Sequence, residues 1–265
     1  MPHIAVDGVE IYHEVQGDGP PLLNIGGTGG DLRQTPAAAS PFAERFRTLA
    51  FDQRGLGRTS HPEGTWTMAD YAEDAAALVR ALGWERCHVV GTSFGGMVAL
   101  ELALRHGDLV DRLVLCCTSP GGALASYPLH ELRDRDPADV MAIRMRLLDD
   151  RWDPDAAEPI PGLGGIYPWI ERQALAPPQD PAAADGLRRQ IDARAGHDVM
   201  ERLGEIAAPT LVCAGRYDTM APLDNAQYLA DHIPDAELAV FDGGHLFMLQ
   251  DPTAHPTMID FLARG

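Results

Sequence analysis

Ser93 lies among small residues, where an apolar segment gives way to a helical one. The local sequence is Gly91-Thr92-Ser93-Phe94-Gly95-Gly96. A serine on a sharp strand-to-helix turn needs glycine neighbours, because the strained backbone brings adjacent residues too close for side chains. Such a turn sets the hydroxyl at a helix N-terminus, where N–H groups favour negative charge. The pattern predicts a nucleophilic serine; the alternative is a β–α turn in which Ser93 only caps the helix.

A serine hydroxyl is a weak nucleophile that needs a general base, which in turn needs an orienting acid. His245 follows an apolar run through Asp242-Gly243-Gly244, and Asp218 follows another through Gly215-Arg216-Tyr217. Both side chains are therefore expected at the carboxyl ends of strands, in the chain order Ser, Asp, His that is typical of this turn. Asp242 is the rival for the acid, because it lies close to His245 in sequence.

The negative charge that develops on a substrate oxygen needs two backbone N–H donors. One should belong to Phe94, the residue after the nucleophile, and the other to the glycine-rich loop 26–30. In that loop Gly27 is the favoured donor, with Thr28 as the alternative. The loop lacks the G-x-G-x-x-G spacing of a dinucleotide site, so it is expected to serve a substrate rather than a cofactor.

The elements that must position these residues alternate between strand and helix. We predict strands over 4–15 (a hairpin), 21–25, 46–51, 87–91, 113–117, 209–214 and 236–241, and helices over 68–82, 95–106, 223–232 and 252–263. The central strands are apolar throughout, which is typical of a parallel sheet covered on both faces. The predicted fold class is α/β, with a mostly parallel eight-stranded sheet flanked by helices.

The segment 119–196 interrupts this alternation with many prolines and with helical stretches at 141–148 and 187–195. We interpret it as a helical cap inserted between two parts of one core, 1–118 and 197–265, over the carboxyl edge of the sheet. The alternative is a run of ordinary crossover helices. The cap aromatics Trp152, Tyr167 and Trp169 are expected, with Thr28, to line an apolar substrate pocket. Packing between cap and core is an equal explanation for them.

Composition excludes several classes of function. The net charge of −18 disfavours nucleic acid and anionic membranes as partners. All 21 basic residues are Arg, so a lysine Schiff base and a P-loop are impossible. His130-Glu131 matches the first two residues of the zinc motif H-E-x-x-H, but Asp134 occupies the position of the second histidine. We therefore expect no metal and no cofactor, and a cytoplasmic protein, because no signal peptide or membrane span precedes the core.

These motifs together resemble the α/β-hydrolase superfamily. The resemblance rests on the loop 26–30, the run Asp52-Gln53-Arg54-Gly55-Leu56-Gly57, the Ser93 turn and the segments that end in Asp218 and His245. It covers both core segments and is most similar to small esterases, enol-lactonases and C–C bond hydrolases. It implies an α/β-hydrolase fold with Ser93 as nucleophile, His245 as base, Asp218 as acid, and Gly27 and Phe94 as oxyanion donors. One departure is Ile25-Gly26, where many relatives carry His-Gly.

The function expected from the sequence is hydrolysis of a small carboxylic ester or lactone through an acyl-enzyme. A C–C bond hydrolase would use the same three side chains. The run 52–55 also resembles proline iminopeptidases, which would need cap carboxylates such as Glu131 or Glu171 near the site. A receptor that binds a small molecule without turnover is the alternative of a different class. The sequence leaves the substrate and the oligomeric state open.

Overall fold

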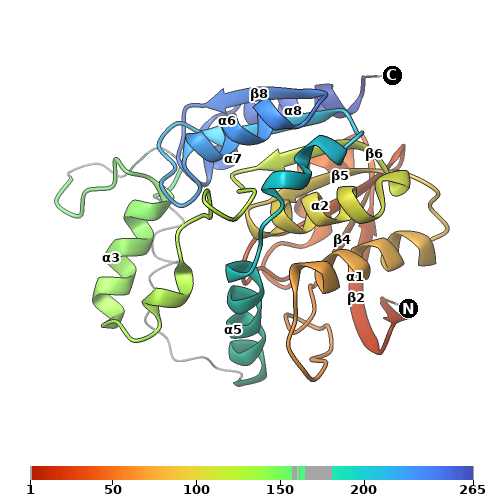
Figure 1. Ribbon diagram of the computed structural model, residues 1–265, viewed down its shortest axis with the longest axis horizontal. Coiled ribbons are helices and arrows are strands. Elements are labelled where there is room, and N and C mark those ends of the chain that lie inside the picture. The colour runs from red at the N-terminus through yellow and green to blue at the C-terminus, as the bar shows by residue number, and fades with distance from the viewer. Residues whose placement is uncertain (1, 157–159, 161, 165–180, 265) are drawn as a thin grey trace.

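A single eight-stranded sheet organises the molecule in the computed structural model, which describes residues 2–156, 160, 162–164 and 181–264 (Figure 1). The strand order is β1-β2-β4-β3-β5-β6-β7-β8. The pairs β1–β2 and β2–β4 are antiparallel, and the pairs from β4–β3 to β7–β8 are parallel. The predicted mostly parallel sheet of eight strands is confirmed.

The elements have the following bounds. The strands are β1 (His3–Val6), β2 (Val9–Gln16), β3 (Pro21–Ile25), β4 (Arg47–Phe51), β5 (Cys87–Thr92), β6 (Val110–Cys116), β7 (Thr210–Gly215) and β8 (Ala236–Phe241). The helices are α1 (Met68–Ala81), α2 (Phe94–Arg105), α3 (Pro137–Leu148), α5 (Pro181–Ala195), α6 (Leu223–His232), α7 (Phe247–Gln250) and α8 (Ala254–Leu262). Short 3₁₀ turns link them at 37–39, 41–44, 107–109, 129–132 and 200–205.

Alternate residues of the central strands face opposite layers, because side chains in a strand point alternately to the two faces. Leu23 in β3 belongs to the apolar cluster that includes residues of α1, α2 and α6, whereas its neighbour Leu22 belongs to the cluster that includes residues of α8. The same alternation separates Val89 from Val90 in β5. Both faces are therefore covered, which is why these strands are apolar throughout.

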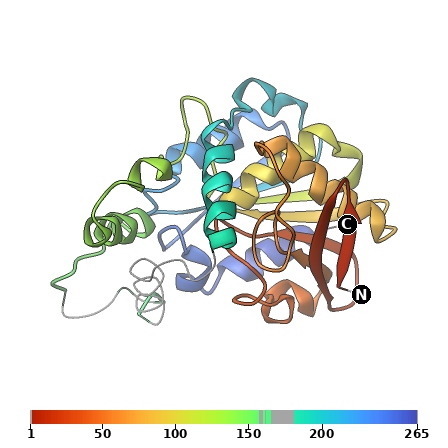
Figure 2. The same cartoon turned by 90° about the horizontal axis from the view of Figure 1, so that it is seen from below.

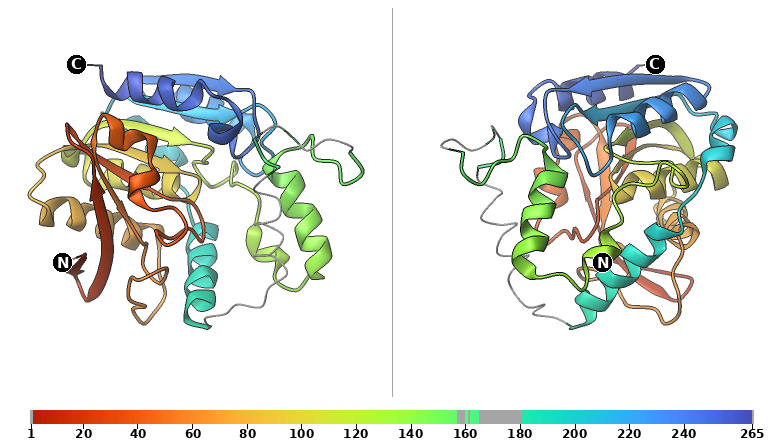
Figure 3. Two further views of the ribbon diagram at one scale, coloured as in Figure 1. Left: turned by 180° about the vertical axis from the view of Figure 1, so that it is seen from behind. Right: turned by 60° about the vertical axis from the view of Figure 1, so that its left-hand side comes forward.

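The segment after β6 forms helices beyond the carboxyl ends of the strands. Figures 1 and 3 show α3 and α5 on the side toward which the strand arrows point, and Figure 2 shows them from below. A separate apolar cluster joins them, with Leu147, Ile191 and Met220 among its buried members. The described part of 119–196 contains no named strand. The boundaries of the cap as a domain stay a prediction.

The cap helices begin earlier than the periodicity of the sequence indicates. Pro137 occupies the first turn of α3, where a missing N–H costs nothing, and Asp136 accepts a hydrogen bond from the Ala138 amide at 2.9 Å. Helix α5 likewise begins at Pro181. At the end of the chain, the predicted helix 252–263 is α8, and the sequence did not predict the short helix α7.

Helix α5 contacts the core backbone to backbone. A Cβ atom on Gly186 would overlap with the carbonyl oxygen of Gly55, so only glycine permits this approach. One turn further along α5, the buried Gln190 accepts a hydrogen bond from the Gly29 amide at 2.8 Å. The side chain of Leu187 also lies against Gly29. This helix is therefore held directly over the glycine-rich loop.

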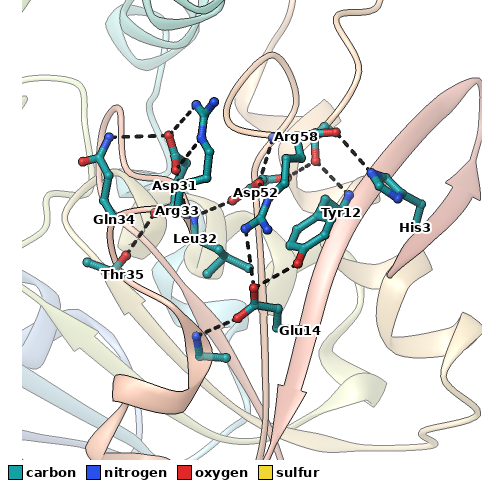
Figure 4. A network of polar contacts seen from close by, with 12 residues as sticks. His3, Tyr12, Glu14, Asp31, Leu32, Arg33, Gln34, Thr35, Asp52 and Arg58 are labelled. Atoms are coloured by element: carbon teal, nitrogen blue, oxygen red, sulfur yellow. Dashed lines mark hydrogen bonds and ion pairs between the residues drawn. The ribbon is translucent and has the colours of Figure 1, made fainter. Parts of the chain in front are cut away.

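The loops that follow β3 and β4 are tied together by a buried carboxylate (Figure 4). Asp52 accepts hydrogen bonds from the Leu32 amide at 2.6 Å and from the Arg58 amide at 2.8 Å. The hydroxyl of Thr59 donates to the Asp52 carbonyl oxygen at 2.5 Å. These bonds hold the loop that follows β3 against the loop that follows β4. A Cβ atom on Gly57 would overlap with the Asp52 carboxylate, so this part of the run 52–57 needs both the polar residue and the glycine.

Candidate active site

The turn between β5 and α2 holds Ser93 in a strained conformation. Its φ of 55° and ψ of −114° lie in a region that residues with a side chain rarely adopt. The Ser93 amide donates to the Cys116 carbonyl at 2.8 Å, and its carbonyl accepts from the Thr118 hydroxyl at 2.7 Å. A Cβ atom on Gly95 would overlap with the Ile25 carbonyl oxygen. The glycine beside the serine is therefore required for the turn to reach the neighbouring strand.

Ser93, His245 and Asp218 form one chain of hydrogen bonds at the rim of the sheet. The Nε2 atom of His245 lies 3.0 Å from Ser93 Oγ, and its Nδ1 atom lies 2.7 Å from Asp218 Oδ2. With the ring proton on Nδ1, the imidazole donates to the carboxylate and its Nε2 accepts the Ser93 hydroxyl proton. The arrangement can remove a proton from Ser93 and stabilise the imidazolium that results.

The backbone fixes the Asp218 carboxylate from the side opposite to His245. The second oxygen, Oδ1, accepts hydrogen bonds from the Met220 amide at 2.8 Å and the Ala221 amide at 2.9 Å. The side chain is buried. Asp242, the rival acid, is 75% exposed and lies 3.9 Å from an Arg151 nitrogen instead. Of the two carboxylates considered from the sequence, Asp218 contacts the imidazole.

The loop that carries His245 is held by the end of α3. The His245 amide donates to the Leu148 carbonyl at 2.6 Å, and the Gly244 amide donates to Gln250 Oε1 at 2.8 Å. The Gln250 amide group in turn donates to the buried Asp149 carboxylate at 2.8 Å. The sequence did not predict this contact, because it depends on how the cap helix meets a loop about 100 residues later.

The two predicted oxyanion donors lie on either side of the serine. A Cβ atom built on Gly27 would be 3.7 Å from the Ser93 Cβ atom, so the loop passes directly over the nucleophile. Phe94 is the first residue of α2, and within the described residues neither its amide nor that of Gly27 donates a hydrogen bond. Thr28, whose amide is the alternative donor, has a hydroxyl that is buried without a partner. Both amides are thus available to a substrate oxygen.

A pair of buried amide side chains supports this loop. Gln53 donates to the Gly26 carbonyl at 2.8 Å, and Gln190 donates to Gln53 Oε1 at 3.4 Å while it accepts from the Gly29 amide. The loop is therefore held at both ends by the core and by α5. Neither glutamine was predicted as a site residue. Gln53 lies in the run 52–57, but nothing in the sequence pairs it with Gln190.

The predicted cap aromatics are only partly described. Trp152 is half-buried after α3, and the guanidinium of Arg146 lies 6.0 Å from its ring centroid. No contact joins it to Ser93. Tyr167 and Trp169 lie outside the described residues, so the pocket that they were predicted to line stays a prediction.

The chemistry available at the rim belongs to the hydroxyl rather than to a thiol. Burial, and then the charge of Asp218, raise the pKa of Cys117 well above its usual range, and burial does the same for Cys213. All four cysteines are free and buried. In the described part of the chain no cluster of three or more His, Cys, Asp or Glu side chains is placed to hold a metal ion. No helix among those residues is long and apolar enough to cross a bilayer.

Known proteins are similar to this chain over almost its whole length. Residues 20–141 match the family model for the alpha/beta hydrolase fold. The putative carbamate hydrolase RutD of Stutzerimonas stutzeri is 31% identical over 96% of this chain and 96% of its own length. The chain belongs to the α/β-hydrolase family. The expected resemblance and the expected fold class are thereby confirmed.

Two solved structures are similar to this α/β-hydrolase over almost its whole length. A hydrolase from Pseudomonas aeruginosa PA01 is 28% identical with a TM-score of 0.79, covering 99% of this chain and 98% of its own. Est816, described as an N-acyl homoserine lactone degrading enzyme, is 26% identical with a TM-score of 0.79, over 98% of this chain and 99% of its own. The family and these relatives identify the protein as a hydrolase of the α/β-hydrolase fold.

Proposed function

We propose that this protein hydrolyses a carboxylic ester or lactone through an acyl-enzyme on Ser93. The observation that carries the proposal is the unbroken hydrogen-bond chain from the Asp218 carboxylate through His245 to the Ser93 hydroxyl. A general base activates a hydroxyl only within hydrogen-bonding reach and in the correct tautomer, and the contact of Nδ1 with Asp218 favours that tautomer.

In the first half of the reaction, His245 Nε2 accepts the proton of Ser93 as the hydroxyl oxygen attacks the substrate carbonyl carbon. The oxygen of the tetrahedral intermediate becomes negative and is bound by the Gly27 and Phe94 amides. Preorganised donors of this kind contribute about 2.7–4 kcal/mol each to lowering the barrier. The imidazolium then protonates the leaving alkoxide, and the acyl group stays on Ser93.

In the second half, water takes the place of the leaving group. His245 removes a proton from that water, which attacks the acyl carbon, and the same proton returns to Ser93 as the acid product leaves. Asp218 stabilises the imidazolium in both halves. A lactone gives a single ring-opened product, because its leaving alkoxide remains attached to the acyl group.

The alternatives use the same side chains or require others. The relatives named as carbamate hydrolases, and the C–C bond hydrolases, also need an activated oxygen at a carbonyl, so only substrate assays separate them from an esterase. An aminopeptidase needs a carboxylate near Ser93. Of the two cap carboxylates considered for it, Glu131 is exposed and Glu171 lies outside the described residues. Among these relatives, Est816 is described as a lactone-degrading enzyme, and this similarity favours a lactone as the substrate.

The test compares wild type with Ser93→Ala on a chain-length series of 4-nitrophenyl esters and on a homoserine lactone series. We expect the variant to lose turnover by about 10⁴-fold or more while its circular dichroism spectrum is unchanged. A fluorophosphonate should label wild type at Ser93 and leave the variant unlabelled. Equal turnover by both proteins, or labelling at another residue, would contradict the proposal. Binding of these substrates without any turnover would favour a receptor.

A further inference from the structure

A small cavity lies beside the turn that carries Ser93. Its volume is about 70 Å³, and its walls come from α2, from α5 and from the chain between 119 and 130. Met97, on the first turn of α2, is one of its lining residues, and the Met97 amide donates to the Ser93 carbonyl at 3.3 Å. Met97 therefore links the wall of the cavity to the turn that carries Ser93.

Arg194, on the last turn of α5, brings a buried cation to this cavity. The residue is 7% exposed, and its Nη2 donates to the Ser126 hydroxyl at 2.6 Å and the Tyr127 carbonyl at 2.9 Å. Its Nη1 is buried without an acceptor, and no described carboxylate pairs with it. Burial lowers its pKa to about 10, so the guanidinium stays charged at neutral pH.

A second lining side chain, His197, is also buried, with 4% of its surface exposed. Burial lowers its pKa to about 4, against smaller opposing effects of the Glu101 charge and of a hydrogen bond with the Ser119 backbone. At neutral pH the ring is therefore uncharged and carries one N–H donor. A buried cation with an unpaired nitrogen and a buried neutral imidazole thus line one cavity.

We propose that this cavity binds the carboxylate of an anionic acyl group, so that the substrate is an ester or lactone of a short dicarboxylic acid. The inference rests on the proposed function, because Ser93 defines the reacting end. An arginine fork matches the two oxygens of a carboxylate, and such a bond stabilises the guanidinium that burial has deprived of water. A volume of about 70 Å³ has room for a carboxylate group.

Arg194 lacks a carboxylate partner in a chain that is rich in carboxylates. The chain carries 39 acidic residues against 21 arginines, so an unpaired arginine is not forced by a shortage of carboxylates. The other arginine that is less than 10% exposed, Arg54, binds Asp74 through two hydrogen bonds. An anion from solution would have to cross a negative surface, and it gains a compensating charge only on reaching Arg194.

The test measures a ratio of kcat/KM values for matched substrates. One set is the mono-4-nitrophenyl esters of succinate, glutarate and adipate, and the other is the same compounds with the free acid capped as a methyl ester. Rates are corrected for spontaneous cyclisation without enzyme. We expect wild type to prefer the best free acid over its capped form by about 100-fold, mainly through KM, since hydrogen bonds to a charged group contribute about 1.5–3 kcal/mol.

Variants separate charge recognition from support of the fold. Arg194→Met should lower the ratio by about 30-fold, and Arg194→Lys should retain part of it. Ser126→Ala removes an anchoring bond of Arg194 and keeps the cation, so it should lower the ratio by less than Arg194→Met does. Arg144→Gln removes a cap arginine that does not line the cavity, and we expect it to change the ratio by less than about threefold. Melting temperatures establish that each variant is folded.

The outcomes distinguish the two proposals. If no ester or lactone is turned over, the proposed function fails. If capped esters are hydrolysed and the ratio is near one, or is the same in wild type and Arg194→Met, the carboxylate site alone is wrong. An equal fall in Arg144→Gln would assign the effect to the cap as a whole and also overturn it. Titration calorimetry of Ser93→Ala with glutarate gives a reading without turnover: Arg194→Met should weaken binding about 30-fold, and unchanged binding would contradict the site.

Discussion

The rim of the sheet and the cavity under α5 both bury polar side chains, but they satisfy them differently. At the rim, Asp218 accepts from two amides and from His245, which uses both of its ring nitrogens. In the cavity, Arg194 leaves one nitrogen unpaired. The proposed catalytic groups are oriented before a substrate arrives, whereas the proposed recognition groups keep donors free for it.

Two arginines show the same contrast within one residue type. Burial lowers the pKa of Arg54, but its hydrogen bonds to Asp74 and the charge of that carboxylate outweigh burial, and its pKa is raised. Arg194 is as deeply buried and has no such partner, so burial prevails. The charge of Arg54 is therefore compensated within the fold, whereas that of Arg194 is not.

The largest effect should come from breaking the satisfied region at its acid. In Asp218→Asn the amide accepts less strongly and can present its NH₂ group to His245 Nδ1, which favours the tautomer that cannot accept the Ser93 proton. We expect kcat to fall by about 10⁴-fold with the melting temperature within a few degrees of wild type. Steady-state kinetics on the best ester measure this. A loss below tenfold would show that the carboxylate does not orient the imidazole.

The next effect concerns stability and compares the two buried arginines. Arg54→Met leaves the Asp74 carboxylate buried without its partner, so the free energy of unfolding should fall by about 3–5 kcal/mol. Arg194→Met loses two hydrogen bonds but also removes an unpaired buried charge, so we expect a change of less than about 1.5 kcal/mol.

Urea denaturation followed by tryptophan fluorescence measures both values under one set of conditions. Asp74→Asn combined with Arg54→Met is the control, because it removes the stranded charge and should recover part of the stability. Equal destabilisation by the two single substitutions would show that Arg194 contributes to the fold as Arg54 does, and would remove the contrast.

The smallest effect depends on pH and sharpens the unsatisfied region. The folded-state pKa of His197, about 4, lies below its ordinary value of 6.5, so the unfolded chain binds more protons between those values. Stability should therefore fall as the pH is lowered through this window, by up to about 1.4 kcal/mol per pH unit from this group. His197→Gln should reduce the slope by that amount. A profile identical to wild type from pH 6.5 to 4 would show that His197 does not titrate in this way.

Much of the core could be predicted because its signals are local. Apolar runs ended by glycine gave the strands, and the small residues around Ser93 gave the turn. The three loops that carry Ser93, Asp218 and His245 follow strands whose parallel order brings their ends to one edge. The hydrogen-bond geometry of these three side chains follows from that topology, and their roles in catalysis stay a proposal.

The rest depends on contacts between distant parts of the chain. Gln53 in the core and Gln190 in α5 form a hydrogen bond that no sequence motif predicts. Arg194 is the same residue type as Arg188 and Arg189 in the same helix and differs from them only in its surroundings. Those neighbours form i,i+3 and i,i+4 ion pairs with Asp185, which a sequence does suggest. Whether a buried side chain finds a hydrogen-bond partner depends on packing, so no sequence pattern predicts it. The start of α3 was missed because Asp136 and Pro137 act through capping rather than through apolar spacing.

The bond from the His245 amide to the Leu148 carbonyl ties the segment predicted as a cap to the loop of the proposed base. A chimera that exchanged residues 119–196 for those of a relative would also exchange the acceptor that steadies the proposed base. Grafting a new specificity onto this enzyme should therefore keep the last turn of α3 native and vary the remainder. Together with the bond from Gln250 to Asp149, this contact fixes the loop of the proposed base to the end of α3.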